Sequence, residues 1–332
     1  MVSPRLLPFV YLLFFLSGAT ALVYEVVWAR MLTQIFGNTT QAISTVLSAF
    51  MAGLAAGSYL FGRVVDARQN PFLAYGLLEA GVGLYGLVIP ALFGLTQRAY
   101  AALYGVAESS AVAFSLIIFA LCFAVILVPT ALMGATLPVL SRFCVTAVTT
   151  LGRRIGDLYA VNTLGAVAGC TLAGFWLIPS LGLRGSTRLA AAVNLSIALA
   201  VVLAVRLPAL RGWAGAGAAP EAAAPPAGRR ATRVDVALLL GFGLSGAAAM
   251  IYENAWVRAL TLVIGMSTYS FTVMLTTFLV GLGLGSLLYA RWSGRREAGL
   301  AGFGVLQLGV ALSALATVPL FERLPFVFLR LR

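Results

Sequence analysis

The stretch SGATALVYEVVWAR, residues 17–30, closes the first long apolar run of the chain, and a close copy, SGAAAMIYENAWVR, occurs at 245–258. Over a slightly longer window, 17–37 against 245–265, 11 of 21 positions are identical. Both copies place a glutamate and an arginine within apolar sequence. A match at a constant offset of 228 residues indicates an internal duplication, which is typical of membrane transporters built from repeats.

The match extends beyond the quoted stretch. It continues from 44–63 to 272–291 with Phe, Gly, Ser and Arg at equivalent positions. It weakens over the next apolar segment, where Glu79 aligns with Gln307. The duplication therefore covers about three helices' length of sequence.

Composition places the whole chain in the membrane class. Of its 332 residues, 61% are hydrophobic and only 10% are charged, and the mean hydropathy is +1.00. Such a composition cannot supply the polar surface of a soluble domain. We therefore predict an all-α polytopic membrane protein whose first partner is the lipid bilayer.

Charge and residue usage exclude several kinds of function. The 22 basic residues are all Arg and are spread through connecting loops, which predicts a topology signal rather than nucleic-acid binding. The chain has no His, so His-based catalysis and His-ligated metals are excluded, and its three Cys residues lack metal-ligand spacing. We expect no metal site, no cofactor and no catalytic residue in this chain.

Nine apolar segments are long enough to cross a bilayer, which requires about 20 residues each. A segment rich in Ala, Pro and Gly, 207–235, separates six of them from three and predicts a cytoplasmic linker. The expected domains are therefore 1–206, with six helices, and 236–332, with three. The nine segments are 7–29, 40–62, 72–95, 110–132, 157–179, 187–206, 236–257, 268–290 and 299–320.

The distribution of Arg predicts the orientation. With the N-terminus in the cytoplasm, 14 of the 22 Arg residues lie on the inner side. The positive-inside rule then places both the N-terminus and the central linker in the cytoplasm, with the chain in the inner (plasma) membrane.

Glu25 and Glu253 are the first candidate site residues. A charged side chain within a span costs about 2.5–3.5 kcal/mol on insertion scales, so it is normally paired or functional. One hypothesis is structural, with the two carboxylates in ion pairs with Arg30 and Arg258. The other is a site for an organic cation, because aromatic faces attract cations and each glutamate has two aromatic neighbours in sequence. These neighbours are Tyr24, Trp28, Tyr252 and Trp256.

Glu79 is a third candidate for binding a cationic substrate. It lies within the third apolar segment, and its counterpart in the repeat is the neutral Gln307. The shared scaffold therefore does not require its charge, which favours a function.

Two further patterns concern helix packing. Gly53 with Gly57, and Gly281 with Gly285, have the G-x-x-x-G spacing that lets helix backbones approach closely. Around Gly134, two prolines in VPTALMGATLPVLSRF predict a kink or break in the fourth helix and a candidate gate.

A parallel duplication of six spans resembles the architecture of major facilitator-type transporters. The stretches SGATALVYEVVWARML, FMAGLAAGSYLFGR, PTALMGATLPVLSR and LYAVNTLGAVAGCTLAGFWLIPSLGLRGS together resemble the membrane portion of bacterial fused facilitator/spermidine synthase-like proteins. The resemblance implies a facilitator-like fold whose second half is truncated here after three helices. It also implies a Rossmann-like aminopropyltransferase domain in a missing C-terminal part.

The chain itself contains no strand, glycine-rich loop and acidic residue in the order that a nucleotide site requires. The resemblance therefore leaves enzymatic activity uncertain, because any aminopropyl transfer would reside in the missing part. Two hypotheses of function remain. The chain binds or transports a cationic, polyamine-related substrate, or it is a membrane anchor for the synthase-like domain.

Overall fold

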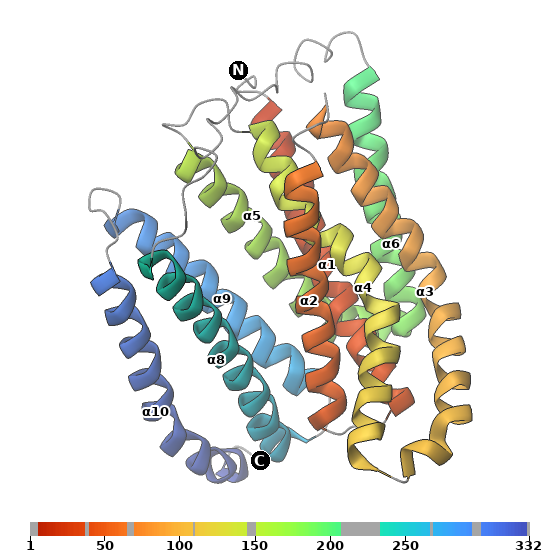
Figure 1. Ribbon diagram of the computed structural model, residues 1–332, viewed down its shortest axis with the longest axis vertical. Coiled ribbons are helices and arrows are strands. Elements are labelled where there is room, and N and C mark those ends of the chain that lie inside the picture. The colour runs from red at the N-terminus through yellow and green to blue at the C-terminus, as the bar shows by residue number, and fades with distance from the viewer. Residues whose placement is uncertain are drawn as a thin grey trace. The chain divides into compact units, whose positions relative to one another are not determined.

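All described elements are helices (Figure 1). The computed structural model describes residues 6–36, 40–64, 70–108, 110–144, 151–206, 233–265, 268–293 and 300–330. Nearly all of the predicted linker 207–235 lies outside these ranges. The chain divides into two compact units, unit 1 (Met1–Ala222) and unit 2 (Ala223–Arg332), which are described separately below.

Unit 1 is a bundle of long helices whose core lies between aromatic side chains of three of them. Phe72 of α3 stacks on Phe143 of α4 at a ring-centroid distance of 4.7 Å, and Phe14 of α1 meets Tyr75 edge-on at 6.3 Å. These rings are almost fully buried, so they fix how α1, α3 and α4 pack. The helices are α1 (Leu6–Phe36), α2 (Thr40–Val64), α3 (Pro71–Glu108), α4 (Ala111–Cys144), α5 (Leu151–Leu172) and α6 (Ile178–Arg206).

The break between the fifth and sixth helices depends on one glycine. The apolar segment Arg154–Arg206 is continuous over 53 residues, far more than one crossing needs. Within it, α5 ends in a single π-helical turn, Ala173–Leu177, and Gly182 then adopts φ 67°. Residues with a Cβ rarely adopt this conformation, so glycine permits the change of direction. As a result α5 packs mainly on α1, whereas α6 packs mainly on α3.

Of the predicted kink or break in the fourth segment, the kink stays a prediction, but the break is wrong, because α4 runs without interruption from Ala111 to Cys144 with Pro129 and Pro138 inside it. The glycine between them has a packing role instead. A Cβ on Gly134 would lie 2.1 Å from the carbonyl oxygen of Leu54 on α2. Gly134 is therefore required for the close approach of α2 and α4.

Unit 2 contains three described helices, α8 (Arg233–Ile264), α9 (Thr268–Ser293) and α10 (Leu300–Arg330). Both α9 and α10 contact α8. Gly265, at φ 93°, ends α8, and its amide donates a hydrogen bond to the carbonyl of Thr261. This is the arrangement of a helix C-terminus closed by a left-handed glycine.

Eight segments of the described chain are long and apolar enough to cross a membrane, with Arg154–Arg206 counted as one of them. Many of their large apolar side chains are exposed on the outside of the bundles, for example Phe242 at 75% and Leu262 at 81%. In water such surfaces would be unfavourable, whereas in lipid they are the expected outer faces. The structure is thus consistent with a membrane protein.

Candidate functional site

Glu79 lies at the centre of a buried polar network in unit 1. Its side chain is 1% exposed, and each carboxylate oxygen accepts one short hydrogen bond. The Ser17 hydroxyl on α1 donates to Oε1 at 2.6 Å, and the Asn194 amide on α6 donates to Oε2 at 2.6 Å. Neutral donors from two other helices therefore hold this carboxylate, and none of its recorded partners among the described residues is basic.

A small cavity borders this network. Its volume is about 10 Å³, which accommodates roughly one water-sized particle. Ligand pockets for organic molecules measure about 300–1,000 Å³, so a polyamine does not fit beside Glu79. Side chains of α1, α3, α4 and α6 line the cavity, namely Ser17, Thr20, Ala21, Glu79, Val82, Met133, Thr136 and Asn194.

The aromatic residues that flank Glu25 are sealed inside unit 1. Tyr24 and Trp28 are at most 1% exposed, and their ring centroids lie 4.7 Å apart. The Tyr24 hydroxyl lies against α3, where a Cβ on Gly86 would be 2.6 Å from it. Glu25 itself is 5% exposed. The predicted cluster of Tyr24, Glu25 and Trp28 is therefore a closed interior region.

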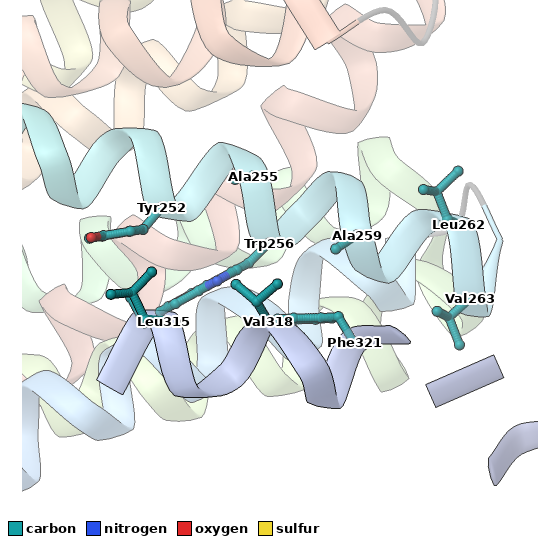
Figure 2. A pocket seen from close by; sticks show the side chains of 10 residues that line it. Tyr252, Ala255, Trp256, Ala259, Leu262, Val263, Leu315, Val318 and Phe321 are labelled. Carbon is teal, nitrogen blue, oxygen red and sulfur yellow. The ribbon is translucent and has the colours of Figure 1, made fainter. Parts of the chain in front are cut away.

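The equivalent residues of unit 2 are arranged differently. Tyr252 and Trp256 stack with ring centroids 5.6 Å apart, and both line a groove of about 540 Å³ between α8 and α10. Figure 2 shows the two rings on α8 facing Leu315, Val318 and Phe321 of α10. Glu253 does not line this groove; it is 1% exposed, and its Oε1 atom has no hydrogen-bond partner among the described residues.

The groove contains aromatic rings but no acidic side chain among its described lining residues, so it offers an amine no counter-charge. A second groove of unit 2, of about 1,140 Å³, includes Trp256, Phe278, Gly281 and Gly285, and its sole charged lining residue among those described is Arg323. An ammonium group in apolar surroundings needs an acidic partner, and a neighbouring arginine would repel it. Within unit 2, the buried carboxylate of Glu253 is thus the better candidate for an amine.

The glycine pairs also differ between the units. In the first pair, a Cβ on Gly53 would lie 1.7 Å from the Thr130 hydroxyl oxygen, and one on Gly57 would lie 1.8 Å from the Ala131 carbonyl oxygen. A Cβ added to Gly281 or Gly285 would have no heavy atom of the described chain within 4 Å, apart from its own surroundings along the helix. Only the first pair makes the close helix contact that the spacing predicts.

Each unit has a hydrogen bond between positions that align in the sequence, with the serine as donor in unit 1 and as acceptor in unit 2. In unit 1 Ser17 bonds to Glu79, and in unit 2 the amide of Gln307 donates to the Ser245 hydroxyl at 2.7 Å. Both pairs are 62 residues apart, and they are related by the offset of 228 residues. Sequence reasoning missed Ser17 as the partner of Glu79, although this serine begins the repeated stretch and recurs as Ser245.

The predicted ion pairs of Glu25 and Glu253 with Arg30 and Arg258 stay predictions. Two of the possible pairings would join different units, whose relative placement is not described. Sequence reasoning also missed Asn194, which donates a hydrogen bond to Glu79, and the two threonines Thr20 and Thr136, which line the cavity beside it. No local pattern places side chains of distant helices around one carboxylate.

The composition and the eight apolar segments thus define an α-helical chain of the membrane class. Within that class, the chain is similar to polyamine aminopropyltransferases. It is 29% identical over 186 residues to "Polyamine aminopropyltransferase" of Mycobacterium tuberculosis, and the match covers 54% of this chain and 32% of that protein. It is 27% identical over 195 residues to "Polyamine aminopropyltransferase 2" of Streptomyces coelicolor, with 57% and 32% covered.

The match therefore spans about a third of the length of these relatives. No protein-family model matches the chain, and no solved structure matches it.

Proposed function

We propose that this chain is the membrane-embedded part of a polyamine aminopropyltransferase-like protein and that it binds a cationic amine, a polyamine or a related organic cation, within the bilayer. The observation that carries the proposal is the carboxylate of Glu253. It is almost fully buried in an apolar segment, and one of its oxygens has no hydrogen-bond donor among the described residues. An ammonium group offers such an oxygen both a charge and several donors.

Its aromatic neighbours add to this chemistry. Tyr252 and Trp256 lie one residue before and three residues after Glu253 on α8, where they could approach the hydrocarbon part of an amine. The names of the relatives supply the substrate class, since polyamine synthesis acts on aliphatic amines. The proposal includes both binding of the amine and its transport. Transport would require the carboxylate to be accessible alternately from the two sides of the membrane.

The proposed architecture is a facilitator-like pair of repeats, with 1–206 as the first six-helix repeat and 236–332 within the second. The recurrence of the Ser17–Glu79 contact as Ser245–Gln307 supports it. The proposed orientation has the N-terminus and the linker 207–235 on the cytoplasmic side of the inner membrane, as the excess of Arg on that side favours.

Measurement of amine binding to the purified chain in proteoliposomes tests this function. Radiolabelled putrescine and spermidine should bind, and Glu253→Gln should remove most of the binding because it deletes the charge while keeping the shape. Asp157→Asn is the matched control, since this acid on α5 accepts a hydrogen bond from Tyr11 and lies outside the proposed site. Equal binding by the two variants would contradict the proposal.

A second candidate function is a membrane anchor without transport. One observation favours it: neutral donors satisfy both oxygens of Glu79 and thereby tie three helices together, which is a structural role for a buried carboxylate. A charge swap between Glu25 and Arg258 distinguishes the two functions. Folding that is lost in each single variant and restored in the double variant indicates a structural ion pair, whereas intact folding with lost amine binding indicates a binding site.

A further inference from the structure

We propose that the cavity beside Glu79 in unit 1 is a binding site for one dehydrated monovalent cation, Na⁺, held by side-chain oxygens of Ser17, Thr20, Glu79, Thr136 and Asn194. This site is separate from the amine proposed at Glu253. The Na⁺ proposal is independent of the amine proposal, because it depends only on contacts within unit 1.

The hydrogen bonds of the lining residues are the first argument. The hydroxyl hydrogen of Thr20 is donated to the carbonyl of Ser17 at 3.0 Å, and that of Thr136 to the carbonyl of Met133 at 2.7 Å. The Ser17 hydroxyl hydrogen is donated to Glu79. A hydroxyl whose only hydrogen is engaged can offer only lone pairs to its remaining neighbours. Three hydroxyl groups therefore act as acceptors toward the cavity.

The amide of Asn194 adds an acceptor that has no partner. Its nitrogen donates to Glu79 at 2.6 Å, which fixes the orientation of the amide group. Its Oδ1 atom is buried and has no hydrogen-bond partner among the described residues, in a side chain only 1% exposed. A buried unsatisfied acceptor destabilises the fold, and a bound cation that contacts it would offset this cost.

Charge is the second argument. Glu79 carries the only formal charge among the residues that line the cavity, and none of its recorded partners among the described residues is basic. A carboxylate at this depth in apolar surroundings is costly unless a cation or a proton neutralises it. An acceptor-rich cavity with a negative charge excludes anions and selects a cation.

Size and ligand type select the kind of cation. A cavity of about 10 Å³ holds about one water-sized particle, so it excludes amines with a carbon chain and hydrated ions. Divalent Mg²⁺ retains several waters and normally has more than one acidic ligand or a phosphate. A small monovalent ion fits both the volume of the cavity and its ligands, which are one carboxylate, hydroxyl groups and an amide oxygen.

The position of the site gives the ion a structural effect. The five oxygen-bearing side chains come from α1, α3, α4 and α6, so one ion would contact four helices. Because it would bind the folded bundle and not the unfolded chain, Na⁺ should raise the stability of unit 1 by mass action.

Thermal unfolding of the purified 332-residue chain in detergent tests the proposal. The protein is titrated with NaCl, KCl or choline chloride at constant ionic strength and pH, and unfolding is followed by tryptophan fluorescence. Na⁺ should raise Tm with a saturating concentration dependence, and K⁺ and choline should not. Glu79→Gln should abolish the Na⁺ effect, and Glu253→Gln should retain it, which separates this site from the amine site.

Conservative variants keep the test valid if Glu79→Gln does not fold. Thr20→Val and Thr136→Val each remove one ligand oxygen while preserving shape, and each should weaken the apparent Na⁺ affinity about tenfold. Thr163→Val is the matched control, because this buried threonine also donates to a backbone carbonyl, that of Tyr159, but does not line the cavity. It should bind Na⁺ like the wild type.

Three results would overturn the proposal. Equal effects of Na⁺, K⁺ and choline would show that no selective ion site exists. A Tm that depends on pH but not on Na⁺ would show that Glu79 binds a proton instead. A loss of Na⁺ affinity in Thr163→Val as large as that in Thr20→Val would show that the threonines act through packing.

Discussion

The two copies of the repeated stretch occupy different surroundings in the two units. In unit 1, Tyr24 and Trp28 are buried, with the Tyr24 hydroxyl against α3, and α2 packs closely on α4 at Gly53 and Gly57. In unit 2, the rings of Tyr252 and Trp256 line an open apolar groove, and the glycines of α9 meet no described neighbour. The comparison shows that the repeated sequence determines where aromatic residues and glycines lie on each helix. The neighbouring helices determine whether those residues are buried or line a groove.

The largest difference is expected at the glycine pairs. Gly57→Leu places a side chain where even a Cβ would lie 1.8 Å from the backbone of α4, so α2 must move away. We expect a loss of roughly 3 kcal/mol or more in the free energy of unfolding, at the upper end of overpacking effects. The measurement is reversible unfolding of the purified chain in mixed micelles.

Gly285→Leu is the matched variant in unit 2, because no heavy atom of the described chain lies near its Cβ position. It should change the same free energy by less than about 0.5 kcal/mol, as for a surface substitution. If both variants destabilise equally, the two glycine pairs pack alike and the proposed difference between the units is wrong.

A smaller difference is expected between a hydrogen bond to Glu79 in unit 1 and the hydrogen bond of Gln307 in unit 2. Asn194→Ala in unit 1 leaves the Glu79 carboxylate with one donor fewer in a buried site, which should cost about 2 kcal/mol of unfolding free energy, as for hydrogen bonds to charged groups. Gln307→Ala removes the neutral bond to Ser245 from a partly buried position. It should cost about 0.6 kcal/mol, the average for neutral bonds between membrane helices.

Chemical denaturation of both variants in one detergent checks this prediction, and Asn194→Asp offers an internal control. Its second carboxylate would repel Glu79 and should destabilise more than alanine does. A cost at Gln307 that equals the cost at Asn194 would show that the charge of Glu79 adds nothing to the network.

The helices could be predicted from the sequence, because the thickness and apolar character of the bilayer require each spanning helix to be long and apolar. The sequence also identified Glu25, Glu79 and Glu253 as exceptional, and all three carboxylates are buried. The spacing of Gly53 and Gly57 led to the prediction of a packing role for this pair. These features are local, so the pattern within one helix contains the necessary information.

Other features depend on distant parts of the chain. The separation of 157–179 from 187–206 was predicted, but no local signal identified Gly182 as the residue that turns the chain. A kink or break was also expected at the prolines of α4, where the helix is continuous. The partners of Glu79 come from helices more than 60 residues away in both directions. No periodicity within a helix indicates which face of another helix will meet it.

The smallest expected difference concerns the tyrosine hydroxyls. The Tyr24 hydroxyl is buried, and it has no hydrogen-bond partner among the described residues. Tyr24→Phe removes an unsatisfied polar atom and should leave the free energy of unfolding unchanged or raise it by up to about 1 kcal/mol. Tyr252 is only partly buried and lines a groove, so Tyr252→Phe should change stability by less than about 0.5 kcal/mol.

The sign of the Tyr24 effect is the informative quantity. If Tyr24→Phe stabilises the protein, the Tyr24 hydroxyl is buried without a hydrogen bond. This burial distinguishes Tyr24 of unit 1 from Tyr252 of unit 2. Marked destabilisation means that the hydroxyl gains a hydrogen bond in the protein, and the sealed description of this aromatic cluster would then be wrong. Equilibrium unfolding of Tyr24→Phe, Tyr252→Phe and the wild type under identical conditions decides between these outcomes, because the two substitutions remove the same atom from two copies of one motif.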